Sequence, residues 1–234
     1  MLAWVTAYLD RPADRLREAV AFWESVTGAM AVPQPLPQFV GLRPVAGDVT
    51  VMLQGIDDGP GGVHLDLAVA DVSAFCARAR ATGATETEDH GSWRVLRSPA
   101  GLRFCVDTAD GRGVRPKPAE GVLLDQVSLD VGPAAYDPEL AFWTALTGWS
   151  PRPTSLPELR RLVPPPGSPV QLLLQRCATE QPAAAHADLA CADIPAVRVR
   201  HEALGAAFVA EFPGWTVMRD PVGAVYCLTS RPPV

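Results

Sequence analysis

Two histidines occupy the same local pattern in different parts of the chain. His64 and His186 each precede an aspartate by two residues, Asp66 and Asp188, inside runs that alternate between apolar and polar residues. Because a period of two is typical of a β-strand, each histidine shares a strand face with its aspartate, roughly 6–7 Å away. An imidazole in this setting serves as a hydrogen-bonding group within the sheet, as a contact for a bound molecule or as a metal ligand. The aspartate either orients the imidazole or lies at the edge of that face.

A cysteine follows each of these patterns on a later predicted strand. By strand alternation, Cys105 shares a face with Arg103 and Asp107, while the apolar residues between them face the other way. Nucleophilic catalysis needs a thiol whose pKa is lowered by a cation or a helix N-terminus, and no Cys-His-Asn spacing supports such a role. We therefore expect a buried, unreactive thiol. Five cysteines without short paired spacing predict reduced thiols in a cytoplasm; they are Cys76, Cys105, Cys177, Cys191 and Cys227.

Both patterns belong to a long internal repeat. Ala21-Phe22-Trp23 recurs 120 residues later as Ala141-Phe142-Trp143, and the two histidine patterns lie 122 residues apart. The difference of two is an insertion in a connecting loop. A repeated unit of roughly 115 residues has the size of a small domain rather than of a solenoid repeat. Further recurring residues are Asp71, Gly83, Trp93, Arg97, Pro99, Gly101 and Cys105 in the first copy, and Asp193, Gly205, Trp215, Arg219, Pro221, Gly223 and Cys227 in the second.

Each copy contains two helix patterns among several strand patterns. In the first copy, apolar residues at helical spacing predict an amphipathic helix over 12–27 that ends at Gly28. Asp71 is a candidate N-cap for a second helix that ends at Gly83. Trp23 and its counterpart Trp143 lie on the apolar stripes, which assigns them to the core. Because strand patterns precede and follow each helix, every quarter of the chain reads β-α-β-β-β. We expect a first domain over 1–110, a linker over 111–121 and a second domain over 122–230.

Composition narrows the classes of protein and of partner. The 234 residues are 48% hydrophobic and 20% charged, which predicts a soluble globular protein with two ordinary cores. A net charge of −6 and a single lysine, Lys117, leave no basic stripe for a phosphate backbone, so nucleic acid is not an expected partner. No apolar run approaches the roughly 20 residues of a membrane helix, and the first ten residues read as a strand rather than a signal peptide. We therefore expect a cytoplasmic protein without a membrane partner.

The order and spacing of these elements resemble the vicinal oxygen chelate superfamily, and more narrowly its glyoxalase-like branch. The resemblance rests on Val63-His64-Leu65-Asp66-Leu67, on the Trp93–Cys105 segment with its Pro-x-Gly turn, and on the counterparts of both in the second copy. It implies an α+β fold of four βαβββ modules, with helices outside curled sheets that surround cavities. It also implies that the fused copies replace a homodimer, so a monomer or weak homodimer is expected.

Many members of this superfamily hold a divalent metal through four places in each copy, usually occupied by His, Gln and Glu. Neither copy of this chain has a carboxylate there, and a hard cation or a facial Fe²⁺ or Mn²⁺ site wants at least one. The resemblance therefore implies degenerate metal sites and no cofactor; if a divalent metal does bind, the weak candidates are Gln126, Gln175 and His186. The residues at the four places are Ala3 or Trp4, Gln54, His64 and Cys105 in the first copy, and Gln126, Gln175, His186 and Cys227 in the second.

Two function classes stay open. The first is a small-molecule-binding protein that sequesters a drug or metabolite, as bleomycin-resistance-like members do. Its ligand contacts would include Trp93 and Trp215, whose indoles either stack on a flat ligand or pack under a loop. The second class is a metal-dependent glyoxalase-, lyase- or dioxygenase-type enzyme on a small oxygenated substrate. A metal-independent isomerase or lyase that uses His64 or His186 as a base also stays open. The predicted ligand-binding set is Gln54, His64, Trp93, Cys105, Gln126, Gln175, His186, Trp215 and Cys227.

Overall fold

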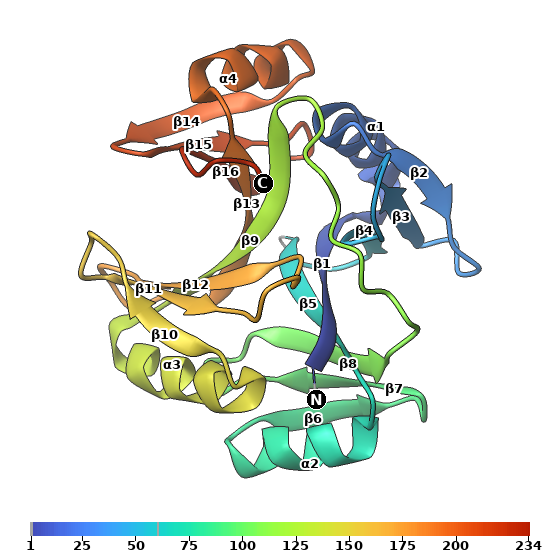
Figure 1. Ribbon diagram of the computed structural model, residues 1–234, viewed down its shortest axis with the longest axis vertical. Coiled ribbons are helices and arrows are strands. Elements are labelled where there is room, and N and C mark those ends of the chain that lie inside the picture. The colour runs from blue at the N-terminus through green and yellow to red at the C-terminus, as the bar shows by residue number, and fades with distance from the viewer. Residues whose placement is uncertain (1, 60) are drawn as a thin grey trace. The chain divides into compact units, whose positions relative to one another are not determined.

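The computed structural model describes residues 2–59 and 61–234, and its elements follow the βαβββ order four times (Figure 1). The first quarter consists of β1 (Leu2–Pro12), α1 (Leu16–Thr27), β2 (Met30–Pro33), β3 (Phe39–Arg43) and β4 (Val51–Ile56). The second consists of β5 (Gly62–Val69), α2 (Val72–Ala81), β6 (Thr85–Asp89), β7 (Trp93–Arg97) and β8 (Arg103–Thr108). The third consists of β9 (Val122–Val131), α3 (Pro133–Thr147), β10 (Ser150–Pro153), β11 (Leu159–Val163) and β12 (Gln171–Arg176). The fourth consists of β13 (Ala184–Cys191), α4 (Ile194–Ala203), β14 (Ala207–Phe212), β15 (Trp215–Arg219) and β16 (Val225–Thr229). The predicted α+β fold of four modules is confirmed.

The helix ends follow the signals in the sequence. The helix predicted over 12–27 is α-helical only from Leu16, because Ala13–Arg15 forms a 3-10 turn. It ends at Gly28, whose φ of 62° lies in the left-handed region that glycine adopts without strain. Asp71 and Asp193 cap α2 and α4, since each carboxylate accepts a hydrogen bond from the backbone N–H three residues further on.

The strands form two eight-stranded sheets, one from each copy of the repeat. The strand order is β2-β3-β4-β1-β5-β8-β7-β6 in the first sheet and β10-β11-β12-β9-β13-β16-β15-β14 in the second. The first strand of a quarter pairs in parallel with its last strand, as β1 does with β4, β5 with β8 and β13 with β16. A parallel pair cannot be closed by a tight turn, and the helix and hairpin of each quarter supply the longer connection.

The chain divides into two compact units, and each unit draws on both copies. Unit 1 contains residues 1–6, 64–113 and 127–185, and therefore α2 and α3. Unit 2 contains residues 7–63, 114–126 and 186–234, and therefore α1 and α4. This grouping joins the second quarter with the third and the first with the fourth. The division into 1–110, 111–121 and 122–230 follows the sequence repeat and stays a prediction.

In each unit, a helix of one copy packs on the last strand of the other copy. In unit 1, Phe104 of β8 contacts Trp143 of α3, with ring centroids 5.3 Å apart. In unit 2, Tyr226 of β16 contacts Trp23 of α1 at the same centroid distance, 5.3 Å. Both tryptophans are at most 1% exposed, so the prediction that they belong to the core is confirmed. Aromatic pairs at such edge-on angles add to the free energy that burial of their area supplies.

A buried carboxylate accepts the indole N–H of each core tryptophan, but the two units supply it from different places. In unit 1, Glu139 of α3 itself accepts from Trp143 Nε1 at 2.7 Å, and burial raises the pKa of this carboxyl group. In unit 2, Asp220 of the turn before β16 accepts from Trp23 Nε1 at 3.2 Å and from Arg11 Nε at 2.6 Å. Because a buried charge is costly unless it is paired, Arg11 and Asp220 depend on each other for stability.

Two further expectations concern cysteine and membranes. All five cysteines are free thiols, and only Cys177 is more than marginally exposed. Among the helices of the described residues, none combines the length and the apolar composition that a membrane crossing requires.

Candidate functional site

Unit 2 gathers polar side chains on one face of β13 and β16. The two strands run parallel with Asp188 opposite Cys227 and Ala187 opposite Tyr226. Since Tyr226 packs against α1, its neighbour Cys227 projects from the opposite face of the sheet. His186 and Asp188 alternate with Ala187 and share the face of Cys227. The sequence-based expectation that this histidine faces away from the helix layer agrees with this register.

The side chains on this face are close enough to act together. His186 Nε2 lies 3.4 Å from Asp188 Oδ1, and Gln126 of β9 donates a hydrogen bond from Nε2 to Asp188 Oδ2 at 2.5 Å. One ligand atom each of His186, Asp188 and Cys227 lies within 4.8 Å of the others. The Asp188 side chain is 3% exposed and that of His186 is 14% exposed, so the imidazole is the more accessible of the two. We call Gln126, His186, Asp188 and Cys227 the polar cluster.

A second buried carboxylate in unit 2 is paired with two arginine side chains. Asp125 accepts a hydrogen bond from the guanidinium of Arg231, and Arg115 Nη2 lies 3.7 Å from its other oxygen. Burial raises the pKa of Asp125, the two arginines oppose that rise, and the charge of Asp188 adds to it. The polar cluster therefore lies in a region of buried charge, where an electrostatic interaction is stronger than at the surface.

The donor set of the polar cluster fits a zinc ion better than manganese or magnesium. Imidazole nitrogen, carboxylate oxygen and thiolate sulfur are all zinc ligands, and three protein ligands leave a fourth position open. A manganese or magnesium ion prefers a shell of oxygen atoms, which one carboxylate cannot provide. The carboxylate comes from Asp188, a position outside the four places compared in the sequence. Of the weak candidates predicted for a metal, Gln126 instead donates a hydrogen bond to Asp188.

The first copy has the same residue types, but their ligand atoms do not form a comparable cluster. His64 and Asp66 lie on β5, and Cys105 of β8 stands opposite Asp66, as in the second copy. Among the described residues, however, only His186, Asp188 and Cys227 bring three such ligand atoms together. Thr6 takes the place of Gln126 and accepts a hydrogen bond from Arg112 Nη1 at 2.9 Å. The short threonine hydroxyl cannot reach as far as the glutamine amide does.

The four remaining predicted site residues lie on strands of both copies. Gln54 is half-buried on β4, where it stands opposite Phe39, and Gln175 is half-buried on β12 opposite Leu159. Trp93 stacks on His90 with ring centroids 3.8 Å apart. In the second copy, Trp215 stacks on Phe212 at 4.8 Å. One face of each indole is thus already covered, and ligand contact by these four predicted residues stays a prediction.

Sequence comparison identifies the family. A family model described as "Glyoxalase-like domain" matches residues 6–107 and again residues 126–229. The chain belongs to the glyoxalase-like domain family. The two matches reproduce the internal repeat, and they agree with the glyoxalase-like branch expected from the His-x-Asp pattern. No curated protein matches the sequence.

Solved structures share the fold of this family member at low sequence identity. The Mn(II)-bound glyoxalase from Novosphingobium aromaticivorans is 17% identical with a TM-score of 0.69, over 97% of this chain and 81% of that one. The 2,2',3-trihydroxybiphenyl 1,2-dioxygenase from Sphingomonas wittichii strain RW1 is 12% identical with a TM-score of 0.66, over 98% and 90%. A xylose isomerase-like TIM barrel/4-hydroxyphenylpyruvate dioxygenase fusion protein is 13% identical with a TM-score of 0.62, over 97% of this chain. The chain spans only 49% of that fusion protein.

Proposed function

We propose that this glyoxalase-like protein binds a small, partly aromatic molecule at the polar cluster and sequesters it, as bleomycin-resistance-like members do. The single observation that supports this is the proximity of His186 and Cys227 to Asp188, whose carboxylate also accepts a hydrogen bond from Gln126, on the sheet face opposite the helix layer. Buried polar groups destabilise a fold unless they form hydrogen bonds. Four such side chains together on one face of the sheet therefore indicate a functional site. A fold alone does not assign a function, and the argument therefore rests on the cluster.

The polar cluster presents complementary groups to a ligand. It offers an amide, an imidazole and a thiol around one carboxylate, so a molecule with hydroxyl, amide or amine groups can both donate and accept hydrogen bonds there. His186 is the most accessible contact, since its side chain keeps 14% of its surface exposed. A hydrogen bond to a charged group contributes about 1.5–3 kcal/mol, which corresponds to roughly 10- to 100-fold in affinity.

Tryptophan fluorescence tests the proposal with a panel of aromatic antibiotics. We expect saturable quenching by at least one compound and a loss of roughly tenfold or more in affinity for His186→Asn. The matched control is His64→Asn, the same change at the counterpart in the first copy, which should leave the affinity unchanged. Absence of saturable quenching across the panel, or an equal loss in both variants, would contradict the proposal.

A second candidate function is a metal-dependent enzyme of the glyoxalase, lyase or dioxygenase type. One ligand atom each of His186, Asp188 and Cys227 lies within 4.8 Å of the others, and this arrangement favours a metal-dependent enzyme. These three residues would hold the ion, which would polarise an oxygen atom of the substrate as a Lewis acid. Gln126 would orient the Asp188 carboxylate through the hydrogen bond that it already donates.

Cobalt titration separates the two candidates. Co²⁺ bound by a thiolate gives a sulfur-to-metal absorption band, which would appear with one equivalent of metal if the polar cluster is a metal centre. Cys227→Ser would remove that band, and Cys105→Ser, the matched change in the first copy, would retain it. If no band appears and the purified protein carries no stoichiometric metal, the metal-dependent function is excluded in favour of ligand binding.

A further inference from the structure

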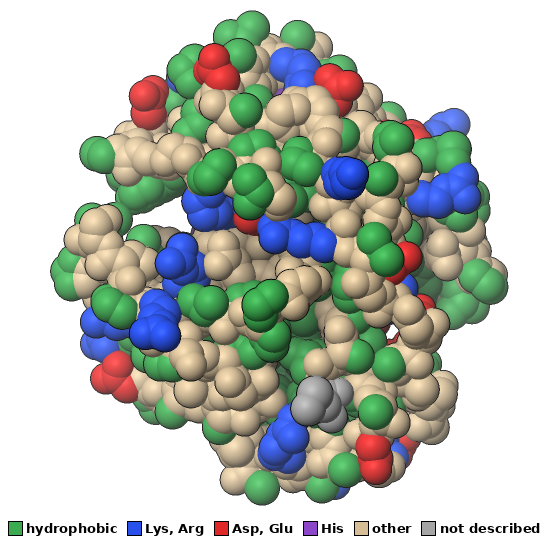
Figure 2. All heavy atoms as spheres, in the orientation of Figure 1, with side chains coloured by type: hydrophobic (Ala, Val, Ile, Leu, Met, Phe, Trp, Pro, Cys, Tyr) green, Lys and Arg blue, Asp and Glu red, His purple; other side chains and the backbone are tan. Residues whose placement is uncertain are grey.

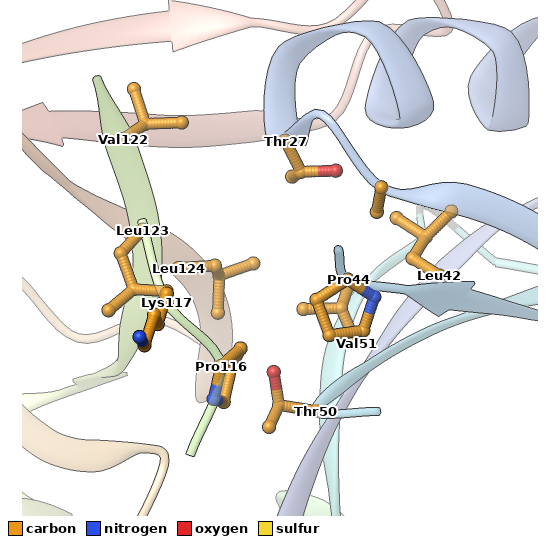
Figure 3. A pocket seen from close by; sticks show the side chains of 11 residues that line it. Thr27, Leu42, Pro44, Thr50, Val51, Pro116, Lys117, Val122, Leu123 and Leu124 are labelled. Carbon is orange, nitrogen blue, oxygen red and sulfur yellow. The ribbon is translucent and has the colours of Figure 1, made fainter. Parts of the chain in front are cut away.

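The linker between the two copies fills a pocket in unit 2. Pro116 is buried there, and Figure 3 shows its ring and the neighbouring Lys117 beside Leu123 and Leu124 of β9, across from Thr50. About 40 Å³ of the pocket remains open. Proline, which has no backbone N–H to satisfy, is well suited to packing against an apolar wall in an extended segment.

Backbone contacts hold this segment in place. Asp48 N–H donates to the carbonyl of Val114 at 2.7 Å, and Lys117 N–H donates to the carbonyl of Ala46 at 3.2 Å. The linker passes so close to Gly47 that a Cβ built there would lie 2.5 Å from Pro116 Cα. Gly47 also has a φ of 99°, which disfavours any other residue. The turn over residues 45–48 is thus a seat for an extended, proline-containing segment.

Unit 1 contains the repeat counterpart of this seat with more open volume. Its turn carries Gly167, which lies 120 residues after Gly47 and has nearly the same φ, 92°. Nothing lies within 4 Å of a Cβ built on Gly167. The adjoining pocket has a volume of about 210 Å³, five times that of the filled one. It is lined by Leu2, Ala3, Trp4, Val5, Gly113, Trp149, Pro165, Pro166, Gly167 and Ser168.

Two tryptophans distinguish the open pocket from the filled one. Trp4 takes the place of Leu124, and Trp149 takes the place of Ala29, 120 residues apart in both cases. Indole faces are the usual partners of proline rings in grooves that bind extended peptides. None of the residues that line this pocket has a titratable side chain, so the wall suits an uncharged, ring-bearing occupant. Exposed apolar residues alone would not mark a site, because such side chains are spread over the face drawn in Figure 2.

We infer that the open pocket of unit 1 docks an extended, proline-containing segment of a partner protein. We take the chemistry of this segment from unit 2, where the proline-containing linker of the chain itself occupies the seat over residues 45–48. The segment would lie over Gly167 as Pro116 lies over Gly47, with its proline ring between Trp4 and Trp149. This docking site is separate from the polar cluster, and it does not depend on the proposed small-molecule function.

Fluorescence anisotropy of a labelled peptide tests the inference on the full chain. The probe is residues 113–120 of this chain, Gly-Val-Arg-Pro-Lys-Pro-Ala-Glu, and the control peptide has both prolines replaced by alanine. We expect saturable binding of the probe and binding about tenfold weaker for the alanine peptide. Equal binding of the two peptides, or no binding of the probe at millimolar protein, would overturn the inference.

Variants locate the binding. Trp4→Leu and Trp149→Ala copy the counterparts Leu124 and Ala29, and each should weaken binding of the probe about tenfold. Leu36→Ala, at an exposed apolar residue that does not line the pocket, should leave binding unchanged. Both pocket tryptophans are buried, so their replacement could unfold unit 1. Ala3→Arg is therefore a second test, because Ala3 is exposed and a long side chain there would obstruct the pocket. Unchanged binding in a folded Ala3→Arg or Trp4→Leu variant would overturn the inference. Displacement of the probe by indole would support the tryptophan-lined pocket, but binding of indole without binding of the probe would overturn peptide docking in favour of a small ligand.

Discussion

Acid sensitivity of unit 2 follows from one buried histidine. His201 of α4 is 0% exposed, its Nδ1 lies 2.9 Å from the hydroxyl of Tyr226, and its Nε2 has no hydrogen-bond partner among the described residues. Burial, with a smaller contribution from the charge of Arg200, lowers the pKa of His201 from 6.5 to about 4. The folded state therefore holds a neutral imidazole at a pH where the unfolded chain binds a proton.

The size and sign of the effect follow from that pKa difference. Because the folded pKa is depressed, stability is fully present above pH 6.5 and falls as the pH drops toward 4, where the unfolded state binds the extra proton. At pH 4 the loss from this residue is about 3 kcal/mol, a large part of the stability of an ordinary domain.

Urea unfolding at several pH values between 7 and 4 measures this loss. His201→Gln keeps a hydrogen-bonding group beside Tyr226 but cannot titrate in this range, so its free energy of unfolding should fall by about 3 kcal/mol less than that of the wild type. The first copy offers a reference, since Ala79 stands at the position of His201 and Phe104 at that of Tyr226. If wild type and variant lose stability in parallel, His201 does not hold a depressed pKa and the reasoning is refuted.

Three further outcomes can be checked with the same protein. Arg11→Met leaves Asp220 buried without its cation and should lower the free energy of unfolding by about 3–5 kcal/mol, while Arg11→Met combined with Asp220→Ser should recover part of that loss in the same urea titration. Gly47→Ala places a Cβ against the linker at positive φ and should lower the melting temperature by several degrees in calorimetry; an unchanged value would contradict the seat described for Pro116. Burial raises the pKa of Cys191 to about 12, so at pH 8 a thiol reagent should modify Cys177 first and Cys191 only after unfolding, as peptide mass mapping would show.

Local signals in the sequence predicted the elements of the fold. The repeated residues predicted four βαβββ modules, and Asp71 and Gly28 marked helix ends because capping depends on a few neighbouring residues. The His-x-Asp pattern placed two side chains on one strand face, because the alternation of side chains along a strand is also a local property. The grouping of quarters into units depends instead on contacts between distant residues, such as Trp23 with Tyr226, which periodicity does not encode.

The candidate site was predictable only in part. Strand alternation predicted the face of His186, and the resemblance to the superfamily pointed to Gln126 and Cys227. The central role of Asp188 depends on the register of β13 with β16 and on the reach of the Gln126 amide. The same residue types in the first copy do not gather, so residue identity alone could not distinguish the two. Trp4 was assigned only to a place where the superfamily holds a metal ligand, and its pairing with Trp149 in one pocket needed the structure.

Chemical-shift mapping tests ligand binding at the polar cluster most directly. The ¹⁵N-labelled protein would be titrated with a compound that quenches its tryptophan fluorescence. We predict that the largest amide shifts occur at Gln126, His186, Asp188 and Cys227, and that Asp188→Asn abolishes them. Shifts concentrated around His64 in the first copy, or unchanged in Asp188→Asn, would contradict the account.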